Sequence, residues 1–155
     1  MDRARVVIKH YTPTRRAQPL PSAKIIGLRG TNEFEIARSI NDGLSTATVG
    51  RLARALSVTD GQILRIVNIP ESTYHSRKRR KEPLTAEESS RVYRVAKVTA
   101  AAEEFFDGDK EAAGRWLASP KLALGGKTPL DFARTAEGSD YVTRLLTRMA
   151  HGVVS

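Results

Sequence analysis

The sequence predicts an all-α fold. Apolar residues recur at intervals of three and four along most of the chain, in segments that begin at helix-capping residues and end at glycine or proline. No segment alternates polar and apolar residues over more than a few positions, as a half-buried strand would. The chain has 155 residues, 40% of them hydrophobic, which suffices for a core without disulfide bonds. It contains no cysteine, so thiol-based zinc sites and cysteine nucleophiles are excluded.

Residues 1–30 do not follow the helical spacing. The segment contains three prolines and two glycines among basic residues, without a sustained pattern. Because such a composition buries little apolar surface, we expect a flexible basic arm. The apolar run 6–8 could form a short strand or a docking contact, and its length does not decide between them.

Two helices are predicted from Thr31 onwards. The first spans about three turns and ends at residues 41–43, where Asn, Asp and Gly break the spacing. Ser45 can cap the second, over residues 46–57. Their apolar faces carry Phe34, Ile36, Ala37 and Ile40 in the first helix, and Val49, Leu52, Ala53 and Leu56 in the second.

Two shorter helices follow. Thr59 and Gln62 form a capping box at the start of a helix over residues 60–67, which the sequence Asn-Ile-Pro then stops. Pro70 suits the first turn of the next helix, over residues 70–80, because the N–H group that proline lacks is not needed there.

The longest helix opens with a second capping box, formed by Thr85 and Glu88, and extends to about Phe106. A shorter helix follows and stops at residues 119–120, the sequence Ser-Pro. The inward positions are Val92, Val95, Ala96, Thr99, Ala102, Phe105 and Phe106 in the long helix, and Ala113, Trp116 and Leu117 in the short one.

The chain ends with a glycine turn and two more helices. Thr128 caps the first of them, and Pro129 occupies its first position. The last helix starts near Ser139, and we expect Gly152 as its C-cap. Its apolar positions are Val142, Leu145, Leu146 and Met149.

The positive charge is confined to one half of the chain. Residues 1–83 contain 16 Lys and Arg against 7 Asp and Glu, whereas residues 84–155 contain 10 of each. A basic half joined to a neutral half is typical of a nucleic-acid-binding region joined to a region with another task. The alternative is a highly charged surface that serves solubility alone. We expect the joint at the polar stretch 81–84.

The helices over residues 46–57, 60–67 and 70–80 follow one another in the order of a helix-turn-helix, although any small helical bundle alternates caps and apolar stripes in this way. In such a motif the last helix enters the major groove of DNA. We therefore expect DNA contacts from Ser72, Thr73, His75, Ser76, Arg77, Lys78, Arg79 and Arg80, with Tyr74 packed at the edge. One half-site offers few contacts, so a homodimer is expected.

Nothing in the sequence indicates catalysis. The three histidines lie in separate segments without metal-ligand spacing, and the paired glutamates belong to a helix cap and to a solvated helix end. The sequence Gly125-Gly-Lys-Thr128 lacks the leading glycine of a phosphate-binding loop. We expect no catalytic residue, no metal site and no cofactor.

The longest apolar runs have three residues, so neither a membrane span nor a signal peptide is expected. We therefore expect a cytoplasmic protein without membrane contacts.

Six short motifs occur in order from residue 85 to residue 153, within a stretch of resemblance that covers about residues 45–153. They are Thr85-Ala-Glu-Glu-Ser, Glu104-Phe-Phe-Asp-Gly-Asp, Ala113-Gly-Arg-Trp-Leu-Ala-Ser-Pro120, Ala123-Leu-Gly-Gly-Lys-Thr-Pro-Leu-Asp131, Thr135-Ala-Glu-Gly138 and His151-Gly-Val153. Together they resemble the Xre/MbcA/ParS-type antitoxins of bacterial RES–Xre toxin–antitoxin pairs. The family's usual Phe-Gly after the long helix reads Phe-Phe-Asp-Gly at residues 105–108, and residues 1–30 lie outside the resemblance.

The resemblance implies a helix-turn-helix region over residues 31–83 and a toxin-binding and dimerisation domain over residues 84–155. It implies a RES-domain toxin that degrades NAD, and an antitoxin that is no enzyme. Such an antitoxin occludes the toxin's active site and, together with the toxin, represses its own operon by binding operator DNA.

For the toxin-binding surface we expect Trp116, Gly125, Gly126, Lys127, Arg148, His151, Gly152, Val153, Val154 and Ser155. Trp116 at helical spacing is also explained by a place in the core. The terminal carboxylate, just after a capped helix, could compete electrostatically with NAD in a pocket built for phosphates, or the tail could simply fray.

A different class of function is also compatible with the sequence. The chain could be a stand-alone dimeric transcriptional regulator whose C-terminal half serves only dimerisation or ligand sensing. Co-purification with an enzyme at fixed stoichiometry would distinguish the antitoxin from this regulator.

Overall fold

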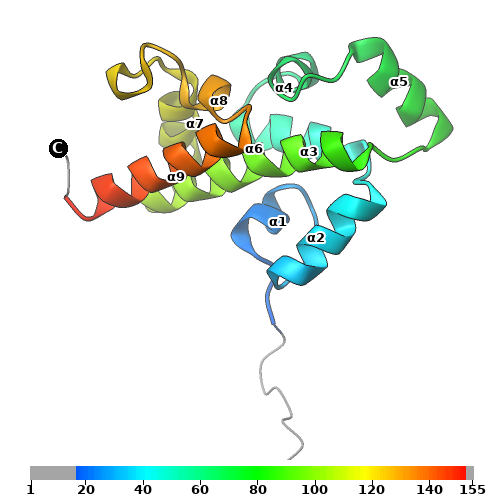
Figure 1. Ribbon diagram of the computed structural model, residues 1–155, viewed down its shortest axis with the longest axis horizontal. Helices are drawn as coiled ribbons and strands as arrows, with labels where there is room; N and C mark the ends of the chain where they lie inside the picture. The colour runs from blue at the N-terminus through cyan, green and yellow to red at the C-terminus, as the bar shows by residue number, and fades with distance from the viewer. Residues whose placement is uncertain (1–16, 153–155) are drawn as a thin grey trace, which may run out of the picture.

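The computed structural model describes residues 17–152, and its helical architecture confirms the predicted all-α fold (Figure 1). No strand occurs within that range. The elements are α1 (Pro21–Ile25), α2 (Glu33–Asp42), α3 (Ala47–Leu56), α4 (Asp60–Ile66), α5 (Glu71–Arg80), α6 (Ala86–Phe105), α7 (Lys110–Ala118), the 3-10 helix η1 (Leu122–Leu124), α8 (Pro129–Phe132) and α9 (Ala136–Ala150).

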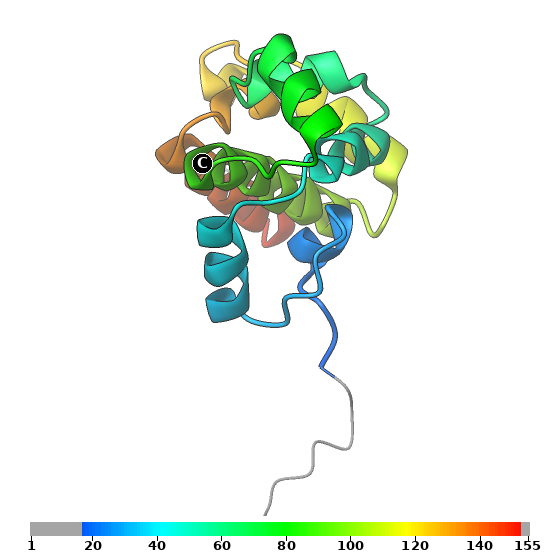
Figure 2. The ribbon, with the colours of Figure 1, turned by 90° about the vertical axis from the view of Figure 1, so that its right-hand side faces the viewer.

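Helix α6 is the central element of the fold. It packs against α1, α2 and α3 from the first half of the chain and against α7 and α9 from the second (Figures 1 and 2). The predicted stripe of α6 is buried from Val92 to Ala102, with Val92, Ala96 and Ala102 fully enclosed and Val95 and Thr99 1% exposed. Phe105 and Phe106, at its end, are half-buried. The buried apolar residues of both halves therefore form one continuous cluster around this helix.

Side-chain caps begin most of the helices, as the sequence predicts. Both capping boxes are present, at Thr59 for α4 and at Thr85 for α6. Thr128 caps α8 by accepting a hydrogen bond from the backbone N–H of Asp131. The start of α3 differs from the prediction that Ser45 is its cap. Thr46 occupies the N-cap position, and Ser45 Oγ, one residue earlier, accepts from the N–H of Ala47 at 3.2 Å.

The prediction of a flexible arm was wrong for residues 17–30. They form α1 and a turn, in which Ala23 and Ile26 are fully buried. Contacts distant in sequence hold this segment: the hydroxyls of Ser22 and Tyr93 share a 2.9 Å hydrogen bond, and Arg51 donates to the carbonyl of Ile26 at 3.3 Å. A five-residue helix is too short to show a periodic pattern, so the sequence did not reveal it. The apolar run 6–8 lies outside the described residues.

Two further expectations need correction. Phe34, predicted on the buried face of α2, is 76% exposed, and among the apolar residues of that helix only Ile36 is buried. Helix α9 begins at Ala136, three residues earlier than predicted, because Thr135 caps it by accepting from the N–H of Gly138. A Cβ atom at Gly138 would lie 1.8 Å from the carbonyl oxygen of Phe132, so only glycine fits there.

In the polar stretch 81–84, Lys81, Glu82 and Pro83 are exposed and only Leu84 is buried. Lys81 ends α5 with a positive φ of 55°, and Leu84 is 2% exposed. The N–H of Leu84 donates to the carbonyl of Leu44 at 2.8 Å. A division of the chain between residues 83 and 84 stays a prediction, and α6 contacts elements on both sides of it.

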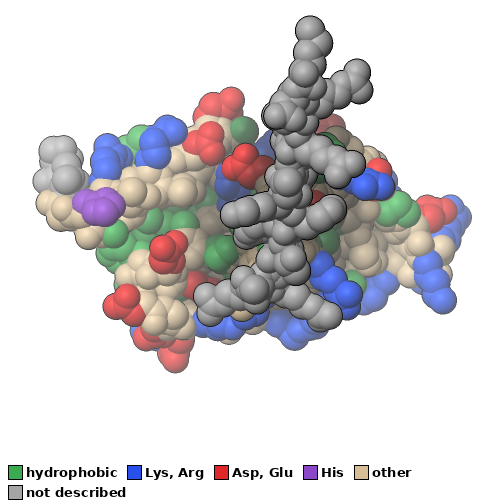
Figure 3. Space-filling model, turned by 90° about the horizontal axis from the view of Figure 1, so that it is seen from below, with side chains coloured by type: hydrophobic (Ala, Val, Ile, Leu, Met, Phe, Trp, Pro, Cys, Tyr) green, Lys and Arg blue, Asp and Glu red, His purple; other side chains and the backbone are tan. Residues whose placement is uncertain are grey.

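Helix α5 lies at one end of the longest axis of the molecule, and the end of α9 lies at the other (Figure 1). Seen from below, Lys and Arg side chains line one edge of the molecule (Figure 3).

Candidate functional site

The turn between α4 and α5 is held from behind by α6. Asn68 lies in this turn with a positive φ of 53°, and Ile69 is 3% exposed. Arg91, on α6, donates from Nε to the carbonyl of Val67 at 2.6 Å and from Nη2 to that of Asn68 at 3.4 Å. One guanidinium group thus satisfies two carbonyls at the end of α4, which fixes the point where α5 begins.

A buried tyrosine anchors α5 from within. Tyr74 is 1% exposed and is the one buried residue of this helix, which confirms the prediction that it packs. Its hydroxyl donates to Asp60 Oδ2 at 3.2 Å, which joins α5 to the first residue of α4. Burial, followed by the charge of Asp60 and this hydrogen bond, raises the pKa of Tyr74 to about 12.

The rest of α5 presents polar and cationic side chains to solvent. Ser72 and His75 are exposed, and Thr73 and Ser76 are half-buried. Three of the four cations at its C-terminal end, Lys78, Arg79 and Arg80, are exposed. This arrangement has small polar groups at the start of the helix and cations after them, as recognition helices in the major groove do.

The fourth cation, Arg77, has a different environment. Its guanidinium pairs with Glu88 on α6, and the two side chains are 21% and 12% exposed. The same oxygen of Glu88 accepts the N–H of Thr85 at 2.9 Å in the capping box of α6. The structure therefore gives Arg77, expected at the DNA backbone, a partner inside the protein.

Opposite α5, the segment 121–128 forms an exposed loop. The N–H of Lys121 donates to the carbonyl of Lys127 at 3.0 Å, and the N–H of Gly126 donates to the carbonyl of Lys121 at 2.9 Å. Gly125 and Gly126 both have positive φ values, of 64° and 81°, which favours glycine there. These bonds close the loop so that its tip projects outward.

Leu122 at the tip of this loop is 98% exposed, and the sequence analysis did not single it out. Nearby in sequence, Trp116 is half-buried against the core, and the ammonium group of Lys121 lies 5.3 Å from its ring centroid.

The other residues predicted to contact a toxin lie at the end of α9. Arg148 is exposed and lies over the ring of Tyr141, 5.7 Å from its centroid. His151 and Gly152 are exposed. Residues 153–155 of the predicted set lie outside the described part of the chain. The loop and the end of α9 are both far from α5 along the molecule (Figure 1).

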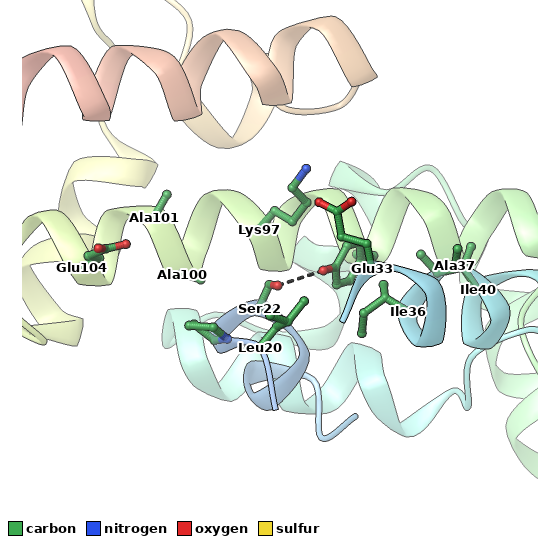
Figure 4. A pocket seen from close by; sticks show the side chains of 12 residues that line it. Leu20, Ser22, Glu33, Ile36, Ala37, Ile40, Lys97, Ala100, Ala101 and Glu104 are labelled. Atoms are coloured by element: carbon green, nitrogen blue, oxygen red, sulfur yellow. Dashed lines mark hydrogen bonds between the residues drawn. The ribbon is translucent and has the colours of Figure 1, made fainter. Parts of the chain in front are cut away.

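An apolar pocket of about 470 Å³ lies between α1, α2 and α6 (Figure 4). Its charged lining residues are Glu33, Lys97 and Glu104. The hydroxyl of Ser22 in its wall bonds to another hydroxyl and not to a base that could activate it.

Over residues 17–152, no group of three His, Cys, Asp or Glu side chains could hold a metal ion. In the same residues, no helix combines the length and the apolar character that a membrane span requires.

In a comparison with known protein families, each half of the chain matches one family. Residues 35–97 match the antitoxin Xre-like helix-turn-helix domain, and residues 101–152 match the C-terminal toxin-binding domain of the antitoxins Xre, MbcA and ParS.

Individual proteins are similar over most of the chain. The chain is 32% identical to an "Antitoxin Xre" of Photorhabdus laumondii over 145 residues, which cover 94% of this chain and 98% of that protein. An "Antitoxin Xre" of Yersinia enterocolitica is 30% identical, with 96% and 100% covered. A "Prs ADP-ribosylating antitoxin" of a Sphingobium strain is 29% identical, with 73% and 76% covered.

The raised pKa of Tyr74 leads to a pH-dependent prediction. In the unfolded chain Tyr74 ionises near pH 10, whereas in the folded chain it keeps its proton to about pH 12. The stability that the protonated hydroxyl contributes is complete below pH 10 and is lost as pH rises towards 12. We expect the stability of the wild type to fall more steeply across this range than that of Tyr74→Phe.

Ultraviolet titration of tyrosine ionisation measures this directly. The difference between wild type and Tyr74→Phe should titrate near pH 12, and Asp60→Asn should lower this midpoint because the repelling charge is removed. A difference curve centred near pH 10 in the wild type would contradict the buried hydrogen bond.

Proposed function

The chain belongs to the Xre family of antitoxins, and we propose that it neutralises a toxin through its C-terminal end while α5 binds operator DNA. The observation that carries this proposal is the placement of α5. It is held from behind by Arg91 and Glu88 of α6, and its polar and cationic side chains face solvent. The loop 121–128 and the end of α9 lie at the other end of the molecule, so one chain can hold both partners at once.

We propose that Ser72, Thr73, His75 and Ser76 face base edges or phosphates, and that Lys78, Arg79 and Arg80 neutralise phosphates. The pairing of Arg77 with Glu88 argues for a different task for this residue, namely orienting α5. Because a single half-site offers few contacts, the binding species is a homodimer with two recognition helices about one turn of DNA apart.

For the toxin surface we propose the loop and the end of α9, with Trp116, the two glycines, Lys127 and Arg148, together with Leu122. An exposed leucine in a closed loop loses little conformational entropy when a partner covers it, and its burial removes apolar surface from water. The finer proposal is a RES-domain toxin that degrades NAD. In that complex the residues from His151 to Ser155 would contact the toxin and block access to its active site.

An antitoxin of this kind needs no catalytic group of its own, because it acts by binding to the toxin and to operator DNA. Its partners, operator DNA and an NAD-degrading enzyme, are encountered in the cytoplasm, where we place this protein. The alternative, a stand-alone regulator, shares the DNA contacts but needs no partner for the exposed Leu122. Purification of a stable complex with the enzyme encoded beside it would decide between the two.

The DNA contacts can be tested by charge removal on α5. The triple variant Lys78→Gln, Arg79→Gln, Arg80→Gln should bind DNA from upstream of its own gene more weakly. The slope of log K against log salt should fall by about 0.9 for each phosphate that the variant no longer neutralises. Gel-shift assays over a salt series measure both quantities.

A control variant with the same charge removed elsewhere is Lys97→Gln, Arg134→Gln, Arg144→Gln. It should keep most of the affinity and the slope. If both triple variants lose affinity equally, α5 is not the DNA-binding element and only the net charge matters.

The toxin surface can be tested with the two large apolar side chains that are exposed among residues 17–152. Leu122→Asp should weaken toxin binding about 30-fold or more, as truncation of a central interface residue does. Phe34→Asp, on α2, is the matched control and should leave binding unchanged. Calorimetry with purified toxin measures the affinity, and an NAD-consumption assay measures inhibition.

Deletion of residues 152–155 separates binding from occlusion in the same assays. We expect the shortened chain to inhibit the toxin less than its remaining affinity would predict. Equal inhibition at equal occupancy would remove the tail from the mechanism. Equal effects of Leu122→Asp and Phe34→Asp would remove the loop from the interface.

A further inference from the structure

A cleft of about 720 Å³ lies between α1, α3 and the start of α7. Four cationic side chains line it: Lys24, Arg51, Arg54 and Lys110. Figures 1 and 2 both place α1 below α6 and α5 above it. The cleft is therefore separate from the surface that α5 presents, and its cations serve no part of the proposed DNA contact.

The cations of the cleft outnumber the acidic groups that line it. Within residues 17–152, none of the four lies in an ion pair with an N···O distance of 4.0 Å or less. Glu103 is the one acidic residue in the lining, and its Oε1 atom is buried without a hydrogen-bond partner among the described residues. Four cations and one carboxylate leave the lining with a formal charge of +3. Like charges gathered around one hollow repel each other unless an anion is bound.

The helix dipole accounts for two of these cations, because Lys24 and Arg54 lie in the last turns of α1 and α3. It does not account for the other two. Lys110 occupies the first position of α7, next to the cap Asp109, where the helix dipole disfavours a positive charge. Arg51 and Arg54 lie three residues apart on α3 and thus share one face of it. The hydrogen bond from Arg51 Nη1 to the carbonyl of Ile26 fixes this guanidinium at the wall and leaves its other N–H groups for a ligand.

We infer that this cleft is a binding site for phosphate groups, separate from α5. A phosphate offers several acceptor oxygens and up to two negative charges, which match the forked donors of two arginines and the ammonium groups of two lysines. The phosphate can come from the backbone of a second DNA segment or from a small phosphorylated molecule, and both present the same chemistry to the cleft. The inference does not depend on the proposed toxin.

The test uses the full chain with pyrophosphate as the small probe and a duplex of random sequence as the nucleic-acid probe. Lys24→Gln with Lys110→Gln removes two exposed cations of the cleft. Arg38→Gln with Arg144→Gln removes the same charge from α2 and α9, and Lys78→Gln with Arg79→Gln removes it from α5. Calorimetry measures pyrophosphate affinity, and fluorescence anisotropy over a salt series measures duplex affinity.

We expect the cleft variant to lose about tenfold or more in pyrophosphate affinity, as the loss of charge-assisted hydrogen bonds would cause, while the other two double variants keep most of it. Glu103→Gln should strengthen pyrophosphate binding, because it removes the one negative charge of the lining. A purely structural role for Glu103 would not produce a gain. A loss of affinity in the cleft variant together with a gain in Glu103→Gln would therefore indicate a binding site, because unfolding would lower the affinity of both variants.

The two probes identify the source of the phosphate. If the cleft variant lowers both duplex affinity and the salt slope beyond the α2 and α9 control, the source is DNA. If it weakens pyrophosphate binding alone, the source is a small phosphorylated molecule. If the cleft variant affects neither probe more than that control does, or if only the α5 variant weakens pyrophosphate binding, the inference is overturned. The latter result would leave the role of α5 in DNA binding intact.

Discussion

The attachment of α5 to α6 is the constraint on which the rest of this structure depends. Helix α5 buries one side chain, Tyr74, and its remaining residues are polar or charged. Apolar packing alone would leave such a helix loosely held, since most helical stability in proteins comes from a buried face. The orientation is supplied instead by two residues of α6: Arg91 bonds the turn that precedes α5, and Glu88 binds Arg77 midway along it.

The contacts of Arg91 and Glu88 are polar and have little access to water. They therefore fix one orientation of α5, and the loss of one partner is costly. Glu88 serves the capping box of α6 and the pair with Arg77 through the same oxygen, so the start of α6 and the orientation of α5 are set together. Loss of one partner from such a pair leaves a charge partly buried without compensation. Because α6 also forms the wall on which α9 packs, the predicted DNA helix and the predicted toxin surface share one rigid support.

Local signals in the sequence predicted most of this architecture. The capping boxes at Thr59 and Thr85 and the stripe of α6 depend on residues within a few positions of one another, so they could be recognised without a structure. The failures concern contacts between distant segments. The short helix α1 depends on Tyr93 and Arg51, which are far away in the sequence. In the sequence, Arg77 is one of five consecutive basic residues, and nothing near it indicates that Glu88 would face it. The exposure of Leu122 likewise depends on how the loop 121–128 closes.

A double-mutant cycle on operator binding tests the central claim most directly. Arg77→Gln, Glu88→Gln and the double variant would be compared with wild type for DNA affinity and for the free energy of unfolding. If α6 orients α5 through this pair, either single change weakens DNA binding, and the two effects are coupled by about 0.5–3 kcal/mol. Additive effects on DNA affinity, with the loss confined to Arg77→Gln, would contradict the account and return Arg77 to the DNA backbone.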